Sequence, residues 1–173
     1  DPKNFTQNFT AAIISSGAIN AIDQNGNLTS TDFLDNLQFP NSLTVESLFK
    51  DVATISRKNL VITRTNDPAA IRSYFDAVGN IYETILGAYS KSDIYIFADA
   101  IDRKDFDSLA ELDQQAAAVG RVASQISKLS VPEQYADVTV TEIKNLLTVK
   151  RAMEIMRTYE QDPLAAYVAF QKR

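Results

Sequence analysis

The sequence of 173 residues contains no cysteine, no histidine and no tryptophan, and only five glycines and five prolines. Without cysteine no disulfide can form, and without cysteine and histidine the chain lacks the ligands that structural zinc uses. The same absences exclude nucleophile pairs that depend on imidazole or thiolate, such as Ser–His–Asp and Cys–His, and the Glu-x-x-His di-iron site. The low glycine and proline contents exclude collagen-like and linker sequences.

A basic stripe is also missing. The chain has 17 lysines and arginines against 22 acidic residues, a formal net charge of −5 and a pI of about 4.7. Nucleic-acid-binding modules cluster their cations, so we expect no nucleic-acid partner. The imbalance lies in residues 1–49, which hold Lys3 as their one cation against five anions, and this argues against docking on anionic lipid there. No apolar run approaches the ~20 residues of a membrane span.

The hydrophobic fraction of 45% is that of a folded chain and not of a disordered one. A chain of this length suits one domain, and such a domain buries ~70% of its unfolded surface. No repeat, low-complexity tract or linker interrupts the sequence. We therefore predict a single helical domain over residues 1–173.

Apolar residues recur mainly at spacings of three and four, which predicts helices. The clearest starts are Asp67-Pro68 and Asp162-Pro163, because Asp caps free N–H groups and Pro suits the first helical position. The predicted helices cover about 6–22, 45–55, 68–90, 92–101, 105–129, 133–159 and a last one from 163, with a short helix around Phe33 to Leu37. We expect the core to contain Tyr74, Phe75, Val78, Ile85, Leu112, Val119, Leu146 and Met153.

One segment is typical of a strand. Residues 59–65 form the only run rich in β-branched residues, and no partner strand is evident elsewhere in the sequence. We therefore predict an extended connector near 59–65 that packs against helices. The predicted fold class is all-α: an irregular multi-helix bundle with short connections and this one connector.

The segment from residue 23 to residue 32 is the best candidate for a metal site. With Gly26 at the sixth position of a calcium loop, Asp23, Asn25 and Asp32 take the third, fifth and twelfth positions. The first position then falls on Ala21, which offers no side-chain oxygen, and the last carboxylate is an Asp where a Glu is usual. A connector with an Asn-Gly turn explains the same residues without a metal, so the degenerate calcium-type loop is the alternative interpretation.

An acidic run from Asp99 to Asp113 could supply paired carboxylates for acid–base catalysis. Arg103 and Lys104 lie within it, however, and Asp105 is placed to cap a helix. We interpret the run as a solvated surface that compensates its own charge, and we predict no catalytic residues and no cofactor. Most aromatic residues fall on apolar helix faces, while Tyr95, Tyr135 and Tyr159 near helix ends are candidates for partly exposed rings.

Several short motifs occur in a recognisable order: Asn27-Leu28-Thr29, Asn66-Asp67-Pro68, Val131-Pro132-Glu133-Gln134-Tyr135, Asn145-Leu146-Leu147 and Asp162-Pro163-Leu164. With these motifs the chain resembles uncharacterised helical proteins of reduced-genome, candidate-phylum bacteria. That group commonly has one N-terminal membrane segment followed by an exported helical domain. The resemblance implies a helical fold and an extracytoplasmic location, and it brings no catalytic residues. The group has a His where this chain has Thr139 or Thr141.

Together these observations predict a non-enzymatic, extracytoplasmic helical domain that acts through protein–protein contacts in a cell-envelope or surface assembly. The alternative is a small-molecule-binding or metal-binding helical domain. Because the sequence begins at Asp1 and not at Met, we expect an apolar segment of ~20 residues before it, which would be the only contact with a membrane. The alternative location is the cytoplasm.

Overall fold

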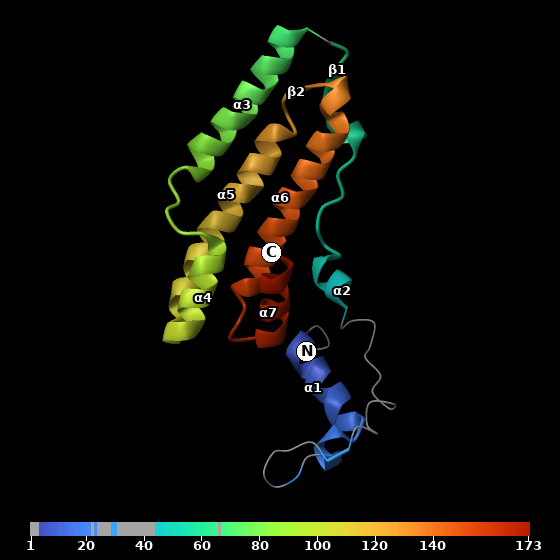
Figure 1. Ribbon diagram of the computed structural model, residues 1–173, viewed down its shortest axis with the longest axis vertical. Helices are drawn as coiled ribbons and strands as arrows, with labels where there is room; N and C mark the ends of the chain where they lie inside the picture. The colour runs from blue at the N-terminus through green and yellow to red at the C-terminus, as the bar shows by residue number, and fades with distance from the viewer. Residues whose placement is uncertain (1–3, 22, 24–28, 31–43, 66) are drawn as a thin grey trace.

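The computed structural model describes residues 4–21, 23, 29–30, 44–65 and 67–173, and it confirms the all-α class (Figure 1). The helices are α1 (Phe5–Ser15), α2 (Val45–Phe49), α3 (Pro68–Leu86), α4 (Asp93–Arg103), α5 (Glu111–Ile126), α6 (Ala136–Met156) and α7 (Pro163–Lys172). Two three-residue strands, β1 (Val61–Thr63) and β2 (Ser130–Pro132), lie at one end of the bundle.

The centre of the bundle is the pair α5 and α6, which run side by side (Figure 1). α3 packs along one side of α5, and α7 packs against α6. The largest fully buried side chains lie along this pair and its flanks: Leu109, Leu112, Val122, Ile126, Val131, Ile143 and Met156. Leu112, Val119, Leu146, Met153 and Tyr74 are buried as predicted, whereas Val78 and Ile85 are half-buried.

The prediction that Phe75 belongs to the core is wrong, because its side chain is 49% exposed. The neighbouring Tyr74 takes the inward position on α3 and is buried. Only one face of α3 packs against the bundle, and a rotation of about 100° per residue carries Phe75 to the edge of that face. The periodicity placed both rings on one apolar face, and the structure separates them.

The prediction of an unpaired connector near 59–65 is also wrong. Val61–Thr63 pairs in parallel with Ser130–Pro132, with Ile62 opposite Val131. The partner strand is three residues long and ends in proline, so in the sequence it has the character of a break between helices. A parallel pair needs a long crossover, here the segment with α3, α4 and α5, and no local pattern reports such a pairing.

Several helix boundaries differ from the predicted ones. α1 ends at Ser15. Gly17, two residues later, has a left-handed conformation with φ of 82°, and a short 3-10 helix then covers Ala18–Ala21. α2 stops at Phe49, well before residue 55. The predicted helices over 105–129 and 133–159 each begin with a 3-10 turn, at Phe106–Ala110 and Glu133–Tyr135. The predicted short helix around Phe33 to Leu37 lies outside the described residues.

Both Asp-Pro pairs begin helices as predicted. Asp67 accepts a hydrogen bond from the N–H of Ala69 at 3.1 Å, and α3 follows with Pro68 at its start. Asp162 accepts from the N–H of Ala165 at 3.3 Å in the same way. Each carboxylate satisfies an N–H group that has no partner within its helix.

Asp162 also caps a second helix. Its carboxylate accepts from the backbone N–H groups of Phe5 at 2.5 Å and Thr6 at 2.8 Å, at the start of α1. The Thr6 hydroxyl donates to the same carboxylate at 2.5 Å and accepts from the N–H of Leu164 at 2.9 Å. The Asp162 and Thr6 side chains therefore hold the first turns of α1 and α7 together.

In the described part of the chain, no helix combines the length and the apolar composition that a bilayer span requires.

Candidate functional site

Of the three predicted ligands in the calcium-type loop, Asp23 is described, whereas Asn25 and Asp32 lie outside the described residues. The loop therefore stays a prediction. Among the residues that the structure describes, no group of three or more acidic side chains could hold a metal ion, and histidine and cysteine are absent from the sequence.

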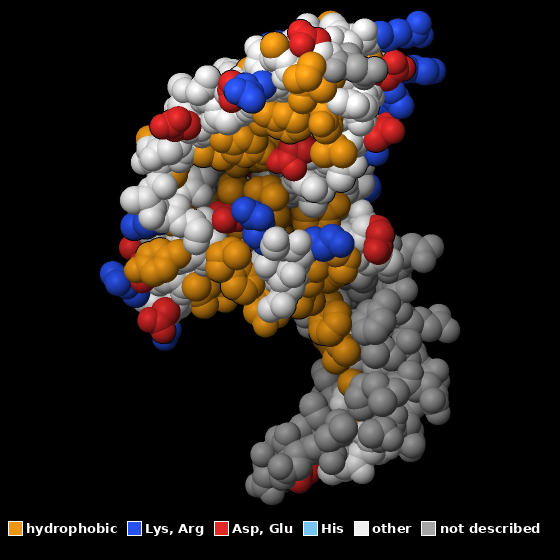
Figure 2. Space-filling view, turned by 45° about the horizontal axis from the view of Figure 1, so that its top comes forward, with side chains coloured by type: hydrophobic (Ala, Val, Ile, Leu, Met, Phe, Trp, Pro, Cys, Tyr) orange, Lys and Arg blue, Asp and Glu red, His pale blue; other side chains and the backbone are white. Residues whose placement is uncertain are grey.

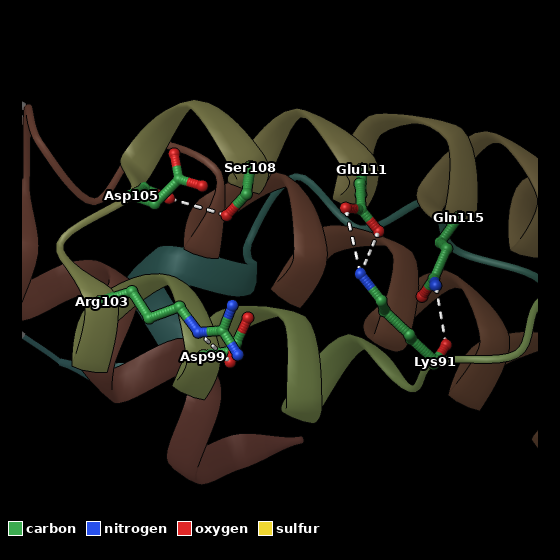
Figure 3. A network of polar contacts seen from close by, with 7 residues as sticks. All are labelled: Lys91, Asp99, Arg103, Asp105, Ser108, Glu111 and Gln115. Atoms are coloured by element: carbon green, nitrogen blue, oxygen red, sulfur yellow. Dashed lines mark hydrogen bonds and ion pairs between the residues drawn. The ribbon is translucent and has the colours of Figure 1, made fainter.

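The acidic run around α4 and α5 carries its own cations (Figure 3). Asp99 pairs with Arg103 at 2.9 Å, one turn further along α4. Glu111 at the start of α5 pairs with Lys91 at 3.4 Å, and the carbonyl of Lys91 accepts from Gln115 at 2.9 Å. These contacts match the interpretation of a surface that compensates its own charge.

Asp105 does not cap a helix through its side chain, so that prediction is wrong. Its backbone carbonyl accepts from the Ser108 hydroxyl at 2.7 Å, as Figure 3 shows. The preceding Lys104 has a left-handed conformation with φ of 56° and ends α4. The chain turns through Lys104 and Asp105 directly into a 3-10 helix. The Asp105 carboxylate makes no capping hydrogen bond with that helix.

A small cavity lies where α3 and α6 flank the C-terminal end of α5. It has a volume of about 180 Å³. We call it the aromatic pocket, and its lining residues are Tyr74, Phe75, Val78, Ile126, Tyr135, Val138, Thr139 and Glu142. Three of the eight are aromatic, three are aliphatic, and Glu142 is the one that carries a charge.

Three aromatic rings form one wall of the aromatic pocket. The Phe75 ring meets Tyr74 and Tyr135 edge to face, with centroids 5.2 Å and 5.0 Å apart. Tyr135 is half-buried, as predicted for a ring near a helix end. Phe75 at 49% exposure and Val138 at 65% form the rim. These two hydrophobic side chains are therefore exposed to solvent at the edge of the aromatic pocket.

Hydroxyl groups fix the buried side of the pocket. The Thr139 hydroxyl donates to the carbonyl of Tyr135 at 2.9 Å. Its one proton is therefore used, and the Tyr74 hydroxyl, 2.7 Å away, donates to the Thr139 oxygen. These two bonds fix the Tyr74 ring against α6.

The Tyr82 hydroxyl, one turn further along α3 from Val78, donates to the Glu142 carboxylate. Burial of the ring, and then the neighbouring Glu142 carboxylate, raise the pKa of Tyr82. Both effects disfavour a phenolate beside an existing negative charge. Tyr82 is thus a neutral donor that positions Glu142.

We expect replacement of Tyr82 by Phe to reduce the loss of stability at alkaline pH. An unfolded tyrosine loses its proton near a pKa of about 10, whereas Tyr82 in the folded state keeps it to higher pH. Above pH ~10 the folded state therefore binds more protons than the unfolded state, and the free energy of unfolding falls by up to ~1.4 kcal/mol per pH unit through this group alone.

Urea unfolding of the wild type and Tyr82→Phe from pH 8 to pH 11.5 measures the difference. Tyr167→Phe, at an exposed ring, is the control that should follow the wild type. Parallel pH profiles for the wild type and Tyr82→Phe would contradict this assignment.

A second cavity of about 450 Å³ lies beside β1, β2 and α3. Its lining residues include five that bear a hydroxyl group, and we call it the hydroxyl pocket: Thr63, Thr65, Ser73, Tyr74 and Ser130. No charged side chain lines it. Tyr74 lines both this cavity and the aromatic pocket.

Comparisons of the chain with protein-family models, with curated proteins and with solved structures found no match.

Sequence reasoning missed Glu142. The signal was present in the spacing, since Tyr135, Val138, Thr139 and Glu142 recur at three and four along the start of α6. A carboxylate that interrupts an otherwise apolar stripe indicates a polar group at the edge of the packed face. The sequence does not show that α3 brings three more pocket residues to that same edge.

Proposed function

We propose that this chain is a non-enzymatic helical domain that acts through protein–protein contacts, with the aromatic pocket and its rim as the contact surface. The observation that carries the proposal is the exposed pair Phe75 and Val138 beside a cavity of about 180 Å³. Figure 2 shows hydrophobic side chains gathered in a band over the upper part of the bundle, with acidic side chains among them. Exposed apolar groups around a hollow are typical of interaction sites.

The size of the aromatic pocket supports a protein partner. Small-molecule sites usually have volumes of ~300–1,000 Å³, and this cavity is smaller. It suits one inserted side chain, which is how anchor residues of protein interfaces bind. The ion pairs in the acidic run support the non-enzymatic part of the proposal, because Asp99 and Glu111 are held by cations and are not free to act on a substrate.

The contact surface can be tested by site-specific photo-crosslinking in cells that produce the full-length protein. A benzophenone amino acid at position 138 should yield a discrete crosslinked species with another protein. The matched control is position 84, where Thr84 is exposed on α3. It lies nine residues after Phe75, or two and a half turns, on the opposite side of the helix. Equal crosslinking at positions 138 and 84, or none at either, would contradict the proposed surface.

The proposal includes a location on the outer side of the cytoplasmic membrane, in a cell-envelope or surface assembly. The resemblance to exported helical domains supports it. Protease treatment of intact cells or spheroplasts that produce the full-length protein should digest this domain. A domain that stays protected until the membrane is broken would indicate the cytoplasm.

The hydroxyl pocket favours a second candidate, a small-molecule-binding domain. Its volume of about 450 Å³ lies in the usual range for such sites, and its uncharged hydroxyl lining suits a neutral polar ligand such as a polyol. A polyol that binds there should raise the melting temperature of the wild type. Ala77→Phe, which places a ring in the cavity, should abolish that rise, and a rise that persists would show that the polyol acts elsewhere.

A further inference from the structure

We infer that the aromatic pocket binds a cationic side chain, a lysine or an arginine, of the protein partner. This inference rests on the proposed function and names the chemistry of the partner at that same site. Its basis is the combination of a carboxylate, three aromatic rings and an apolar wall in one cavity sized for a single side chain.

Glu142 differs in its partner from Glu133 and Asp137, the two other carboxylates near the start of α6. Asp137 pairs with Arg57 at 3.4 Å, and Glu133 lies 3.8 Å from Arg64. Among the described residues no cation lies within ion-pair distance of Glu142, and its carboxylate accepts from the neutral phenol of Tyr82. A half-buried carboxylate without a cation leaves its charge uncompensated, and a partner's cation would compensate it.

The rings supply the second part of the site. Cations bind over aromatic faces, because the ring quadrupole places negative charge there. Tyr74, Phe75 and Tyr135 line the pocket together within ring-to-ring distances of about 5 Å. Edge-to-face packing turns the three rings in different directions, which is how aromatic cages surround an ammonium group.

The remaining wall suits the methylene stem of a lysine or arginine. Val78, Ile126 and Val138 line the pocket with aliphatic groups. Long cationic side chains lie along apolar surface with their stems while the charged end reaches a polar group. In this pocket the stem would contact Val138 at the rim and the charged end would reach Glu142.

The other occupants fit less well. A purely apolar side chain would remove water from the Glu142 carboxylate and give it no counter-charge. An acidic side chain would meet a like charge in the same small cavity. Only a cation satisfies the apolar and the charged parts of the lining together.

The test uses N-acetyl-lysine methylamide as the probe, a lysine side chain without a partner protein. The isotope-labelled protein is titrated at constant ionic strength, and the methyl resonances of Ile126 and Val138 are followed by NMR. We expect saturable shifts at both residues. The same compound with its side-chain nitrogen acetylated has no charge and should bind about five- to tenfold more weakly.

Two glutamine variants separate a local charge from a general one. Glu142→Gln keeps an oxygen acceptor for Tyr82 and removes the charge, so the Kd for the lysine probe should rise about five- to tenfold. Glu133→Gln removes a charge from the same end of the molecule, outside the pocket lining, and should leave the Kd within about twofold. Phe75→Leu keeps an apolar rim without the ring and should also weaken binding. An absence of saturable shifts, equal binding of the neutral compound, or equal effects of both glutamine variants would overturn the inference.

This titration and the crosslinking experiment fail independently. The probe needs no partner protein, whereas the crosslink at position 138 needs one. A crosslink without charge-dependent probe binding would leave the protein contact in place and overturn the cation assignment. Charge-dependent binding without a crosslink would support the cation site and overturn the protein-contact proposal.

Discussion

Replacing Leu112 by Ala is expected to lower the free energy of unfolding by about 2–5 kcal/mol. The Leu112 side chain is fully buried in the first turn of α5, the helix that packs along α6. Its removal loses apolar burial and leaves a cavity that the packed helices can only partly close. Phe75→Ala removes a larger side chain, yet it should cost about 1.5 kcal/mol or less, because that ring is half-exposed and contributes mainly its edge-to-face contacts.

Urea unfolding of the wild type and the two variants at one pH measures both losses. The denaturant slopes should stay equal, so that the shift of each midpoint reports stability. A loss at Phe75 that equals or exceeds the loss at Leu112 would contradict the inward orientation of Tyr74 and the outward orientation of Phe75.

Replacing Asp162 by Ala should destabilise the protein about twice as much as replacing Asp67 by Ala. Both residues precede a proline at a helix start, so the local change is the same. Asp67 caps α3 alone, whereas Asp162 accepts from α7 and from α1. A lost N-cap costs about 0.5–2 kcal/mol, which gives about 1–4 kcal/mol for the two caps at Asp162.

Hydrogen exchange distinguishes the second cap from a general loss of stability. In Asp162→Ala the amides of Phe5 and Thr6 should exchange faster relative to the amides of α5 than they do in Asp67→Ala. Equal destabilisation by the two substitutions, with unchanged relative exchange at α1, would show that the contacts of Asp162 with α1 contribute nothing.

Local signals explain what the sequence could predict about this fold. Asp67-Pro68 and Asp162-Pro163 act within one helical turn, so the starts of α3 and α7 follow from neighbouring residues alone. Long stripes at spacings of three and four gave α5 and α6, and with them the burial of Leu112. In these elements local propensity and tertiary packing favour the same conformation.

Features that depend on distant segments could not be predicted. The pairing of Ile62 with Val131 joins two three-residue strands across three helices, and neither strand is stable without the other. The exposure of Phe75 and the surroundings of Glu142 also could not be predicted from neighbouring residues. Both depend on how α3 lies against α6. For the candidate site, the sequence identified Tyr135 as a partly exposed ring and missed the carboxylate that lies near it in the pocket.

The shared carboxylate of Asp162 has a consequence for synthesis on the ribosome. Phe5 and Asp162 are 157 residues apart in the chain, and residues are added at ~5–20 per second. The segment that becomes α1 is therefore complete roughly 7–30 seconds before the Asp162 carboxylate that accepts from Phe5 and Thr6 exists. During that interval Phe5, which is buried in the folded protein, has neither the Asp162 carboxylate nor α7 to pack against. Of the helices that the structure describes, α1 is made before the others and is among the last that can reach its final position.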